Sequence, residues 1–570
     1  MSDPVTEIAY LPLKPSLDLS SSEIKEAWKS TLRTIALQPG FKTGYWGKQI
    51  ENPDTLHVTM AGSLELIRYQ PVLKDRRNTS GTDEPNTIDP MVEELRMSPL
   101  VWWNVKEHIE PQQQVQRGYA VLGHVPEADN SPQDDASVRN GATRTPVLLN
   151  TDSPWSAFLC GSQGSGKSHA LSCMLENCLL TDETILPRVG FNPHPLAGLV
   201  FHYDRCQGSG VCEAAYLCTS VPTTVLVSPS NYGRLKRAYE AMAEKQGAKI
   251  TVKQLYVLPK YLDTERMKTL MAVGKEDEVP LYMQTILMIL RKMAIESQGL
   301  GAFNYATFKD ELAATKFASG QDGPMKLRLD LLESFMKRCE YTSKILPNTE
   351  NDFLAGTPGS LTIVDLTDPV IDADSACVLF DICLSVFIQQ TKCGKIVALD
   401  EAHNYMTEGS GAAKAFTEKL LRTVREQRHQ AVRVVIATQE PSINTQLLDL
   451  CSITMVHRCT SPAWFNVLNR HVAALYLNLP TSSQTGASGD EEVEVPKDDR
   501  ALFHEIVRLK LGESLLFCPT AAVKVVGGEI ERMEGGYVRF KTRQRVTADG
   551  GKSKLAAEGT QETGPINATV

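Results

Sequence analysis

The chain has 570 residues, enough for roughly three to four domains of about 150 residues each. Hydrophobic residues make up 42% and charged residues 22%, an ordinary globular mix with ample capacity to form a core. The net charge of -9 argues against a surface covered with nucleic-acid-binding charge, although it leaves room for a local basic patch. No stretch reaches the roughly 20 apolar residues of a membrane span, and the N-terminus lacks the pattern of a secretion signal. We therefore expect no membrane segment and an intracellular, reducing location, nuclear or cytoplasmic.

Thirteen cysteines are scattered over the chain. Cys206, Cys212 and Cys218 are evenly spaced but lack the tight two-residue pairing of zinc sites. We interpret them as small buried hydrophobic residues, with a metal site as the alternative.

Residues 1–60 predict a strand, a helix and a strand. The helix is indicated by apolar residues at helical spacing behind a Ser-rich cap, namely Ile24, Trp28, Leu32 and Ile35. Pro39 and Gly40 end this pattern, and a short aromatic strand follows at Tyr45 and Trp46. Residues 6–60 resemble the front half of an antibiotic-biosynthesis-monooxygenase-like ferredoxin fold. We interpret the segment as accessory and assign it no catalytic residue.

Polar, turn-rich stretches divide the rest of the chain. They lie at residues 78–90, 126–143 and 481–499, and a disordered tail is expected from about residue 549. The resulting organisation is a linker-rich region at 61–143, an ATPase core at 144–478 with an insertion at about 230–350, a disordered acidic loop at 479–499, and C-terminal strands at 500–548.

Short apolar runs alternate with helical patterns from about residue 145 onward. The runs are 156–160, 199–203, 224–227, 361–365, 396–399 and 432–437. They are rich in β-branched residues and nearly continuous in hydrophobicity, which is typical of strands buried on both faces. The fold class predicted is therefore α/β, a mainly parallel sheet covered by helices, with a more helical insertion and a buried helix at 376–388.

A glycine-rich loop follows the first of these runs and precedes a helical pattern. It consists of Gly161, Ser162, Gln163, Gly164, Ser165, Gly166, Lys167 and Ser168. The order strand, G-x-x-x-x-G-K-S, helix is that of a P-loop, in which backbone N–H groups and the helix dipole bind phosphates. Lys167 would neutralise the β- and γ-phosphates of ATP, and Ser168 would offer its hydroxyl to Mg²⁺. We include His169, the next residue, among the nucleotide-binding residues.

The run at 396–399 ends in Asp400 and Glu401, the arrangement of a Walker B element. Asp400 would hold Mg²⁺, and Glu401 would polarise the attacking water as general base. Surface acids also follow strands by chance, so the interpretation depends on the P-loop. Gln439 follows the neighbouring run and is a candidate sensor of the γ-phosphate, the alternative being an ordinary residue at the end of a strand.

A basic segment lies between these two runs. Residues 414–433 hold six Lys and Arg against two Glu, and Arg425 and Arg428 share one helix face. A solvated helix face is the default interpretation. The functional alternatives are an arginine finger that reaches a neighbouring subunit's ATP, or contact with DNA phosphates.

Together these motifs resemble the HerA–FtsK class of P-loop motor ATPases, with HerA as the nearer match. The resemblance covers about residues 145–545 and includes Asp-Glu-Ala-His-Asn after the Walker B strand, Ala-Thr-Gln-Glu-Pro-Ser from residue 437, and Gly-Glu-Ser-Leu-Leu-Phe from residue 512. It implies a RecA-like sheet with an extra strand between the P-loop and Walker B strands, and a hexameric ring that translocates duplex DNA. It further implies that Arg425 or Arg428 is a trans arginine, that Gln439 is the sensor, that Glu401 is the base, and that Arg458 faces the nucleotide.

The sequence departs from that class in three places. Asp400 stands where HerA usually has Glu, Glu440 stands where the family often has Arg or Asp, and the N-terminal barrel is not recognisable. Residues 91–123, with Trp102 and Trp103, are a candidate for a reduced substitute. The function predicted is an ATP- and Mg²⁺-dependent motor on duplex DNA that acts as a homo-oligomer. The alternatives are a nucleotide-gated interaction protein and, less favoured because Glu401 and Gln439 indicate water as nucleophile, a small-molecule kinase.

Overall fold

A computed structural model of the chain describes most of its residues. The described ranges are 5–12, 41–48, 55–62, 90–109, 118–126, 145–204, 210–271, 282–298, 303–336, 353–406, 409–471 and 497–550, except residues 316, 318, 319, 321, 391, 441 and 442. The chain divides into two compact units, Met1–Thr87 and Ile88–Val570.

The first unit contains an antiparallel sheet of three described strands. The order is β1 (Val5–Pro12), β3 (Thr55–Gly62) and β2 (Phe41–Lys48). Tyr45 pairs with Thr59, which confirms the strand predicted at Tyr45 and Trp46, whereas β3 was not assigned from the sequence. The helix predicted at residues 24–35 lies outside the described residues.

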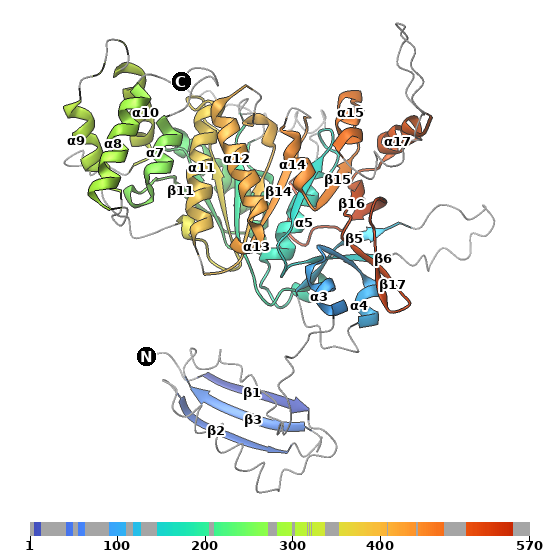
Figure 1. Cartoon of the computed structure of the whole chain (residues 1–570). Helices are drawn as coiled ribbons and strands as arrows, with labels where there is room; N and C mark the ends of the chain where they lie inside the picture. Colours follow the sequence, from blue (N-terminus) through green and yellow to red (C-terminus); the bar gives the residue numbers. More distant parts are fainter. Residues whose placement is uncertain are drawn as a thin grey trace, which may run out of the picture. The chain divides into compact units, whose positions relative to one another are not determined.

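The second unit is built on one large sheet whose first half is parallel (Figure 1). The parallel strands are, in order, β11 (Thr251–Gln254), β10 (Thr223–Val227), β12 (Ser360–Asp365), β9 (Ala197–His202), β13 (Lys395–Leu399), β14 (Val432–Thr438), β7 (Ser156–Cys160) and β15 (Ile453–His457). The extra strand β14 lies between the P-loop strand β7 and the Walker B strand β13. This order confirms the predicted RecA-like fold.

The second half of the sheet is mainly antiparallel and joins the N- and C-terminal parts of this unit. It continues through β16 (Glu513–Phe517), β19 (Val538–Thr542), β5 (Tyr119–Val125), β6 (Thr145–Asn150), β4 (Leu100–Trp102), β17 (Ala522–Val526) and β18 (Glu529–Arg532), and β8 (Gly190–Phe191) pairs with β5. Helices α3 (Pro90–Met97) and α4 (Trp103–Ile109) flank β4 in sequence. Strands β4 and β5 are therefore part of the same sheet as the strands that carry the P-loop and Walker B motifs.

The central strands are buried on both faces. In β13, Ile396 and Ala398 pack into one hydrophobic core, while Val397 and Leu399 pack into the other, and all four are 0% exposed. This alternation explains why the strands read as continuous apolar runs.

Helices cover both faces of the parallel half. One face packs against α11 (Ala373–Gln389), α12 (Gly411–Arg425), α14 (Thr445–Leu450) and α15 (Pro462–His471), and Figure 1 shows α11 and α12 in front of the sheet. The other face packs against α5 (Lys167–Leu179) and α6 (Tyr232–Lys245). Side chains fix where two of these helices begin: Asp372 accepts a hydrogen bond from the Ser375 N–H before α11, and Ser410 accepts one from Ala413 before α12.

Among the described residues, four α-helices lie in the insertion between β11 and β12. They are α7 (Thr264–Met271), α8 (Tyr282–Glu296), α9 (Tyr305–Ala314) and α10 (Asp322–Ser334). The first part of the predicted insertion, from residue 230, is instead α6 followed by β11, which extends the sheet. The remaining described helices include α13 (Gln427–Gln430) and α17 (Lys497–Arg508). In the part of the chain that the structure describes, we find no helix with the length and apolar character needed to cross a membrane.

Candidate nucleotide-binding site

The phosphate loop joins β7 to α5 and requires glycine at two positions. Gly161 and Gly166 have φ angles of 146° and 112°, conformations that residues with a Cβ rarely adopt. A Cβ at Gly161 would lie 2.8 Å from Cβ of His457, and one at Gly166 would lie 2.9 Å from Cα of Gly512. The loop is thus packed too closely for any side chain at these positions.

Backbone hydrogen bonds hold the loop between the end of β15 and the turn before β16. The Ser162 N–H donates to the carbonyl of Arg458 (2.9 Å), and the Gly512 N–H donates to the carbonyl of Ser165 (3.2 Å). His457, completely buried beneath the loop, lies with Nδ1 3.2 Å from the carbonyl oxygen of Glu513, so this nitrogen carries the proton.

Lys167, Ser168 and Asp400 converge at the start of α5. The Lys167 ammonium donates to the carbonyl of Ser162 (3.0 Å), and burial lowers its pKa while the nearby Glu401 and Asp400 oppose the shift. The Ser168 hydroxyl donates to Oδ1 of Asp400 (3.4 Å), which is 3% exposed. Burial, followed by the charge of Glu401, raises the pKa of Asp400. A hydroxyl and a carboxylate beside a phosphate loop are the oxygen ligands that Mg²⁺ prefers, so these residues fit that ion.

Glu401 is held at the tip of β13 by its neighbours on β14. Its φ of 48° and ψ of 47° place a non-glycine residue in the left-handed region, a form of strain that often marks functional sites. Gln439 Nε2 donates to Oε1 of Glu401 at 2.6 Å, and Nδ1 of His403 lies 3.5 Å from Oε2. Burial lowers the pKa of His403, which favours the neutral ring. Gln439 is itself fixed, since its carbonyl accepts a hydrogen bond from the Trp464 indole (2.6 Å).

A cavity of about 800 Å³ unites these groups. Its lining includes Gln163, Gly164, Gly166, Lys167, Ser168, His169, Asp400 and Glu401, all singled out from the sequence. It also includes His202 at the end of β9, Glu213 from the segment after β9, and Gly512, Lys541 and Asp549 from the C-terminal part. Sequence reasoning did not assign any of these five residues to the nucleotide site, although Gly512 begins one of the motifs that resemble the HerA–FtsK class.

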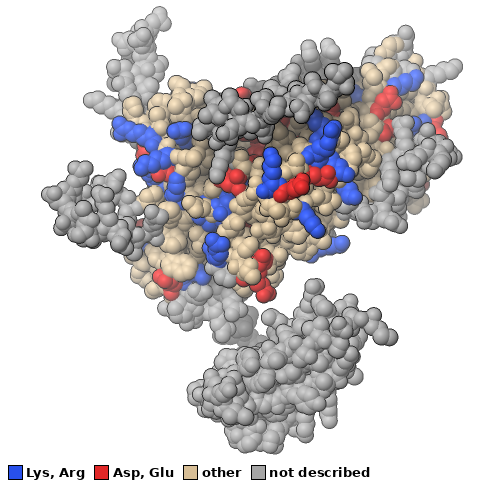
Figure 2. All heavy atoms as spheres, turned by 180° about the vertical axis from the view of Figure 1, so that it is seen from behind, with Lys and Arg blue, Asp and Glu red and all other residues tan. Residues whose placement is uncertain are grey.

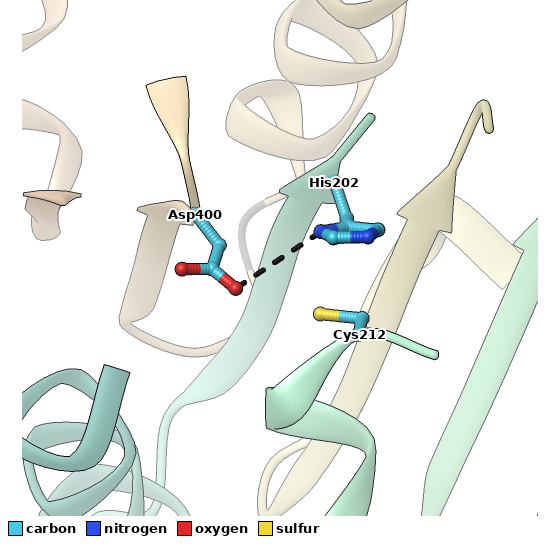
Figure 3. A group of neighbouring side chains, drawn as sticks. All are labelled: His202, Cys212 and Asp400. Atoms are coloured by element: carbon cyan, nitrogen blue, oxygen red, sulfur yellow. Dashed lines mark ion pairs between the residues drawn. The ribbon is translucent and has the colours of Figure 1, made fainter. Parts of the chain in front are cut away.

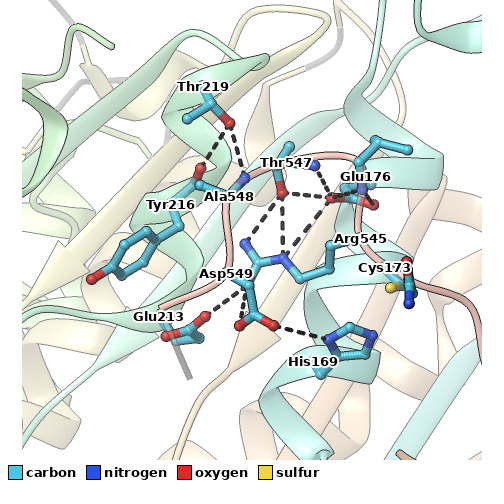
Figure 4. Close-up of polar contacts among 12 residues, drawn as sticks. His169, Cys173, Glu176, Glu213, Tyr216, Thr219, Arg545, Thr547, Ala548 and Asp549 are labelled. Atoms are coloured by element: carbon cyan, nitrogen blue, oxygen red, sulfur yellow. Dashed lines mark hydrogen bonds and ion pairs between the residues drawn. The ribbon is translucent and has the colours of Figure 1, made fainter. Parts of the chain in front are cut away.

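Residues 543–550, which we call the C-terminal segment, cross α5 and end at this cavity (Figure 4). The Arg543 guanidinium donates to Oε2 of Glu176 on α5 (2.6 Å), and the Thr547 N–H donates to Oε1 (2.9 Å). Glu176 is 0% exposed, so these partners satisfy a fully buried carboxylate. Arg545 connects the segment to Glu213 at 2.6 Å.

His169 lines the cavity and contacts the C-terminal segment. Its Nε2 lies 2.8 Å from the carbonyl of Arg543, and its Nδ1 lies 3.9 Å from Asp549 (Figure 4). The ring borders the cavity, but its polar contacts are with the C-terminal segment. A role in nucleotide binding stays a prediction.

The structure does not bring Arg425 and Arg428 to the cavity of their own chain. The chain leaves Asp400 at the carboxyl end of β13 and returns along α12 to the amino end of the parallel strand β14. Both arginines are exposed near that return, at the opposite edge of the sheet. Arg433, counted with the basic segment, is only 2% exposed and donates to the carbonyl of Thr151 (2.9 Å), so it is a structural residue of β14.

The two remaining observations concern charge outside the cavity. Arg458 is exposed at the end of β15, where its carbonyl, rather than its guanidinium, contacts the phosphate loop.

Figure 2 shows Lys and Arg spread over the described surface of one face of the molecule, with Asp and Glu among them. This face carries no patch of a single sign among the described residues.

No protein-family model matches the chain, and no curated protein matches it. Among solved structures, VirB4 of Thermoanaerobacter pseudethanolicus is similar over 75% of this chain and 96% of that chain, with 12% identity and a TM-score of 0.40. The genome packaging NTPase B204 from Sulfolobus turreted icosahedral virus 2, in complex with AMPPCP, is similar over 65% of this chain and 94% of that chain, with 8% identity and a TM-score of 0.26. The strand order and the phosphate loop together establish a RecA-like P-loop fold for this chain.

Proposed function

We propose that the protein is an Mg²⁺-dependent ATP hydrolase that works as a HerA–FtsK-like motor, translocating duplex DNA as an oligomeric ring. The observation that carries the hydrolase assignment is the convergence of Lys167, Ser168, Asp400 and Glu401 on one cavity, with Gln439 bonded to Glu401. Each has the chemistry that its part in hydrolysis requires.

Lys167 and the backbone N–H groups of the phosphate loop would bind the β- and γ-phosphates. Burial lowers the pKa of this ammonium, and the charges of Glu401 and Asp400 offset the shift only in part. A phosphate placed beside it would reverse that shift, because an adjacent anion favours the charged form. Ser168 and Asp400 would hold Mg²⁺, which supplies positive charge to the phosphate oxygens.

Glu401 would accept the proton of the attacking water. Its Oε1 is bound by Gln439, whose own position is fixed through Trp464, so the carboxylate is oriented before ATP arrives. A positioned carboxylate base typically contributes about 10²–10⁴-fold to a hydrolysis rate. Water as the nucleophile favours hydrolysis over transfer of the phosphate to another substrate.

The exposed basic residues near the end of α12 support the oligomeric part of the proposal. Arg425 and Arg428 lie away from their own cavity, so they could reach an ATP only in a neighbouring subunit. An arginine supplied in trans is worth about 10³–10⁵-fold in turnover in P-loop enzymes. Contact with DNA phosphates is the competing role, and it would make binding strongly dependent on salt.

The test is steady-state ATP hydrolysis with and without duplex DNA, with Glu401→Gln beside the wild type and Glu440→Gln as matched control. Glu440 is an exposed acid near the same edge. We expect DNA to raise turnover, Glu401→Gln to abolish it, and Glu440→Gln to retain it. Turnover that ignores DNA would leave an ATPase but remove the translocase, and the nucleotide-gated interaction protein would take its place.

A mixing experiment tests the ring. Glu401→Gln and Arg425→Ala/Arg428→Ala proteins are each expected to be inactive alone. Mixed rings should regain part of the activity, since an intact base in one subunit then meets intact arginines from the next. No recovery in a mixture that forms ring-sized particles would contradict the trans role.

A further inference from the structure

Three buried side chains beside the phosphate loop form a group of which the proposed hydrolysis uses only Asp400. They are His202 at the end of β9, Cys212 at the start of the short helix Glu213–Thr219, and Asp400 (Figure 3). One ligand atom from each lies within 4.8 Å of the other two. A nitrogen, a sulfur and a carboxylate oxygen form a donor set typical of zinc.

The Nδ1 atom of His202 has no hydrogen bond inside this group. The residue is 5% exposed, and its Nδ1 has no hydrogen-bond partner among the described residues, the nearest carboxylate oxygen being Oδ2 of Asp400 at 4.0 Å. Leaving a buried polar atom unbonded costs about 1–3 kcal/mol, so such atoms in native proteins call for an explanation. A cation between the imidazole and the carboxylate would give His202 Nδ1 a partner.

The three residues are held by rigid elements. His202 and Asp400 end neighbouring strands, and their backbones are bonded to Leu366 and Phe201 respectively (3.0 and 3.1 Å). The Cys212 N–H donates to the hydroxyl of Tyr239 at 3.1 Å. Tetrahedral zinc places its ligand atoms about 3.5 Å apart, given bonds of about 2.0–2.3 Å, so only small side-chain rotations would close the site.

The charge around the group also favours a cation. Two adjacent carboxylates, Asp400 and Glu401, lie here, and the positive charge of Lys167 interacts with both of them. His202 and Asp400 line the cavity that contains the phosphate loop, and this cavity is open to solvent. A metal ion therefore has a route to the site.

We propose that His202, Cys212 and Asp400 bind a thiophilic divalent cation of the Zn²⁺ type, which competes with Mg²⁺ and ATP for Asp400. On binding, the Cys212 thiol releases its proton to solvent and a metal–sulfur bond forms. Water or a nucleotide oxygen would complete the coordination. Occupation would stop ATP turnover, because Asp400 cannot serve both ions. The inference rests on the proposed function only through this shared carboxylate.

The direct test is a titration of the full-length, nucleotide-free protein with Co²⁺, a spectroscopic substitute for Zn²⁺. We expect one tightly bound equivalent with a near-ultraviolet thiolate-to-cobalt absorption band. Cys212→Ser should remove the band, whereas Cys218→Ser, a matched change at a buried cysteine in the same short helix, should keep it. His202→Ala should weaken binding by more than the about 10–100-fold that loss of an outer-shell partner costs.

A second measurement follows turnover of MgATP with added Zn²⁺. Wild type and Cys218→Ser should be inhibited, and Cys212→Ser should resist, while its turnover without Zn²⁺ shows that it is folded. A missing thiolate band, or a band lost equally in both cysteine variants, would overturn the metal site while leaving the ATPase intact. A band in a protein that fails to hydrolyse ATP would uphold the metal site and remove the proposed function.

Discussion

Gln439 Nε2 donates a 2.6 Å hydrogen bond to Oε1 of Glu401, so the tips of β14 and β13 are joined at the point where the water nucleophile would be activated. The bond connects the extra strand of the RecA-like order with the Walker B strand. A change at the end of one strand therefore reaches the base on the other.

The first prediction concerns this bond. Gln439→Ala should lower kcat for ATP hydrolysis by about 100-fold, because the carboxylate loses its orientation, while ATP affinity changes little. Turnover and nucleotide binding should be measured separately. Gln446→Ala, at an exposed glutamine that begins α14, serves as the control and should behave as wild type. Equal losses of kcat and affinity would show that Gln439 binds the nucleotide rather than positioning Glu401.

The second prediction compares two glycines of the phosphate loop. Gly166→Ala combines φ of 112° with a Cβ that would lie 2.9 Å from Gly512, and we expect a loss of about 3 kcal/mol, or about 100-fold in ATP affinity. Gly164→Ala has open space around the Cβ and φ of 69°, so only about 1 kcal/mol should be lost. Binding of a fluorescent ATP analogue would rank the two. Equal effects would mean that packing against Gly512 does not matter.

The third prediction concerns acid stability. Burial lowers the pKa of His457 to about 3, so the folded protein keeps this ring neutral while the unfolded chain protonates it near pH 6.5. The unfolded state then binds more protons, and stability falls as the pH drops below 6.5, by about 2 kcal/mol between pH 7 and pH 5. His457→Asn keeps a donor toward Glu513 and should lose less stability over that interval. Denaturant unfolding at both pH values checks this.

A matched variant sharpens the comparison. His429→Asn replaces an exposed histidine and should leave the pH dependence of the wild type unchanged. A His457→Asn protein with the full wild-type loss between pH 7 and pH 5 would contradict the assignment.

The fourth prediction concerns the C-terminal segment. Arg543→Met removes the 2.6 Å ion pair of the fully buried Glu176 and leaves Arg545, at 4.0 Å, as its remaining ionic partner, so we expect a loss of about 3 kcal/mol in the free energy of unfolding. Arg539→Met breaks an ion pair whose arginine is 40% exposed, and it should cost about 1 kcal/mol or less. Denaturant midpoints of both variants would show the difference, and similar midpoints would contradict the importance of Glu176.

The parts of the site that could be predicted from the sequence are those whose residues are neighbours in the chain. The phosphate loop combines a strand, a loop and a helix start within a few residues, and Asp400 and Glu401 directly follow an apolar run. Both runs read as strands because their side chains are buried on both faces of the sheet. Local chemistry and periodicity were therefore sufficient to predict the phosphate loop and the two acids after the Walker B strand.

The rest depends on pairing between distant segments. His202 and Cys212 meet Asp400 only because β9 lies beside β13, and the spacing of the cysteines along the chain contains no information about that pairing. The basic segment was interpreted by default as a solvated helix face, but Arg433 is buried and donates to the backbone carbonyl of Thr151. Side-chain spacing along one helix cannot reveal which edge of a sheet the helix returns to.

The order of the sheet has a consequence for synthesis. The phosphate loop at 161–168 is translated well before the turn at Gly512 that contacts it and the segment that crosses α5. A nascent chain that stops before residue 510 would thus carry the complete P-loop motif without the backbone that supports it. ATP binding is therefore expected to begin only after residues 512–550 have been synthesised.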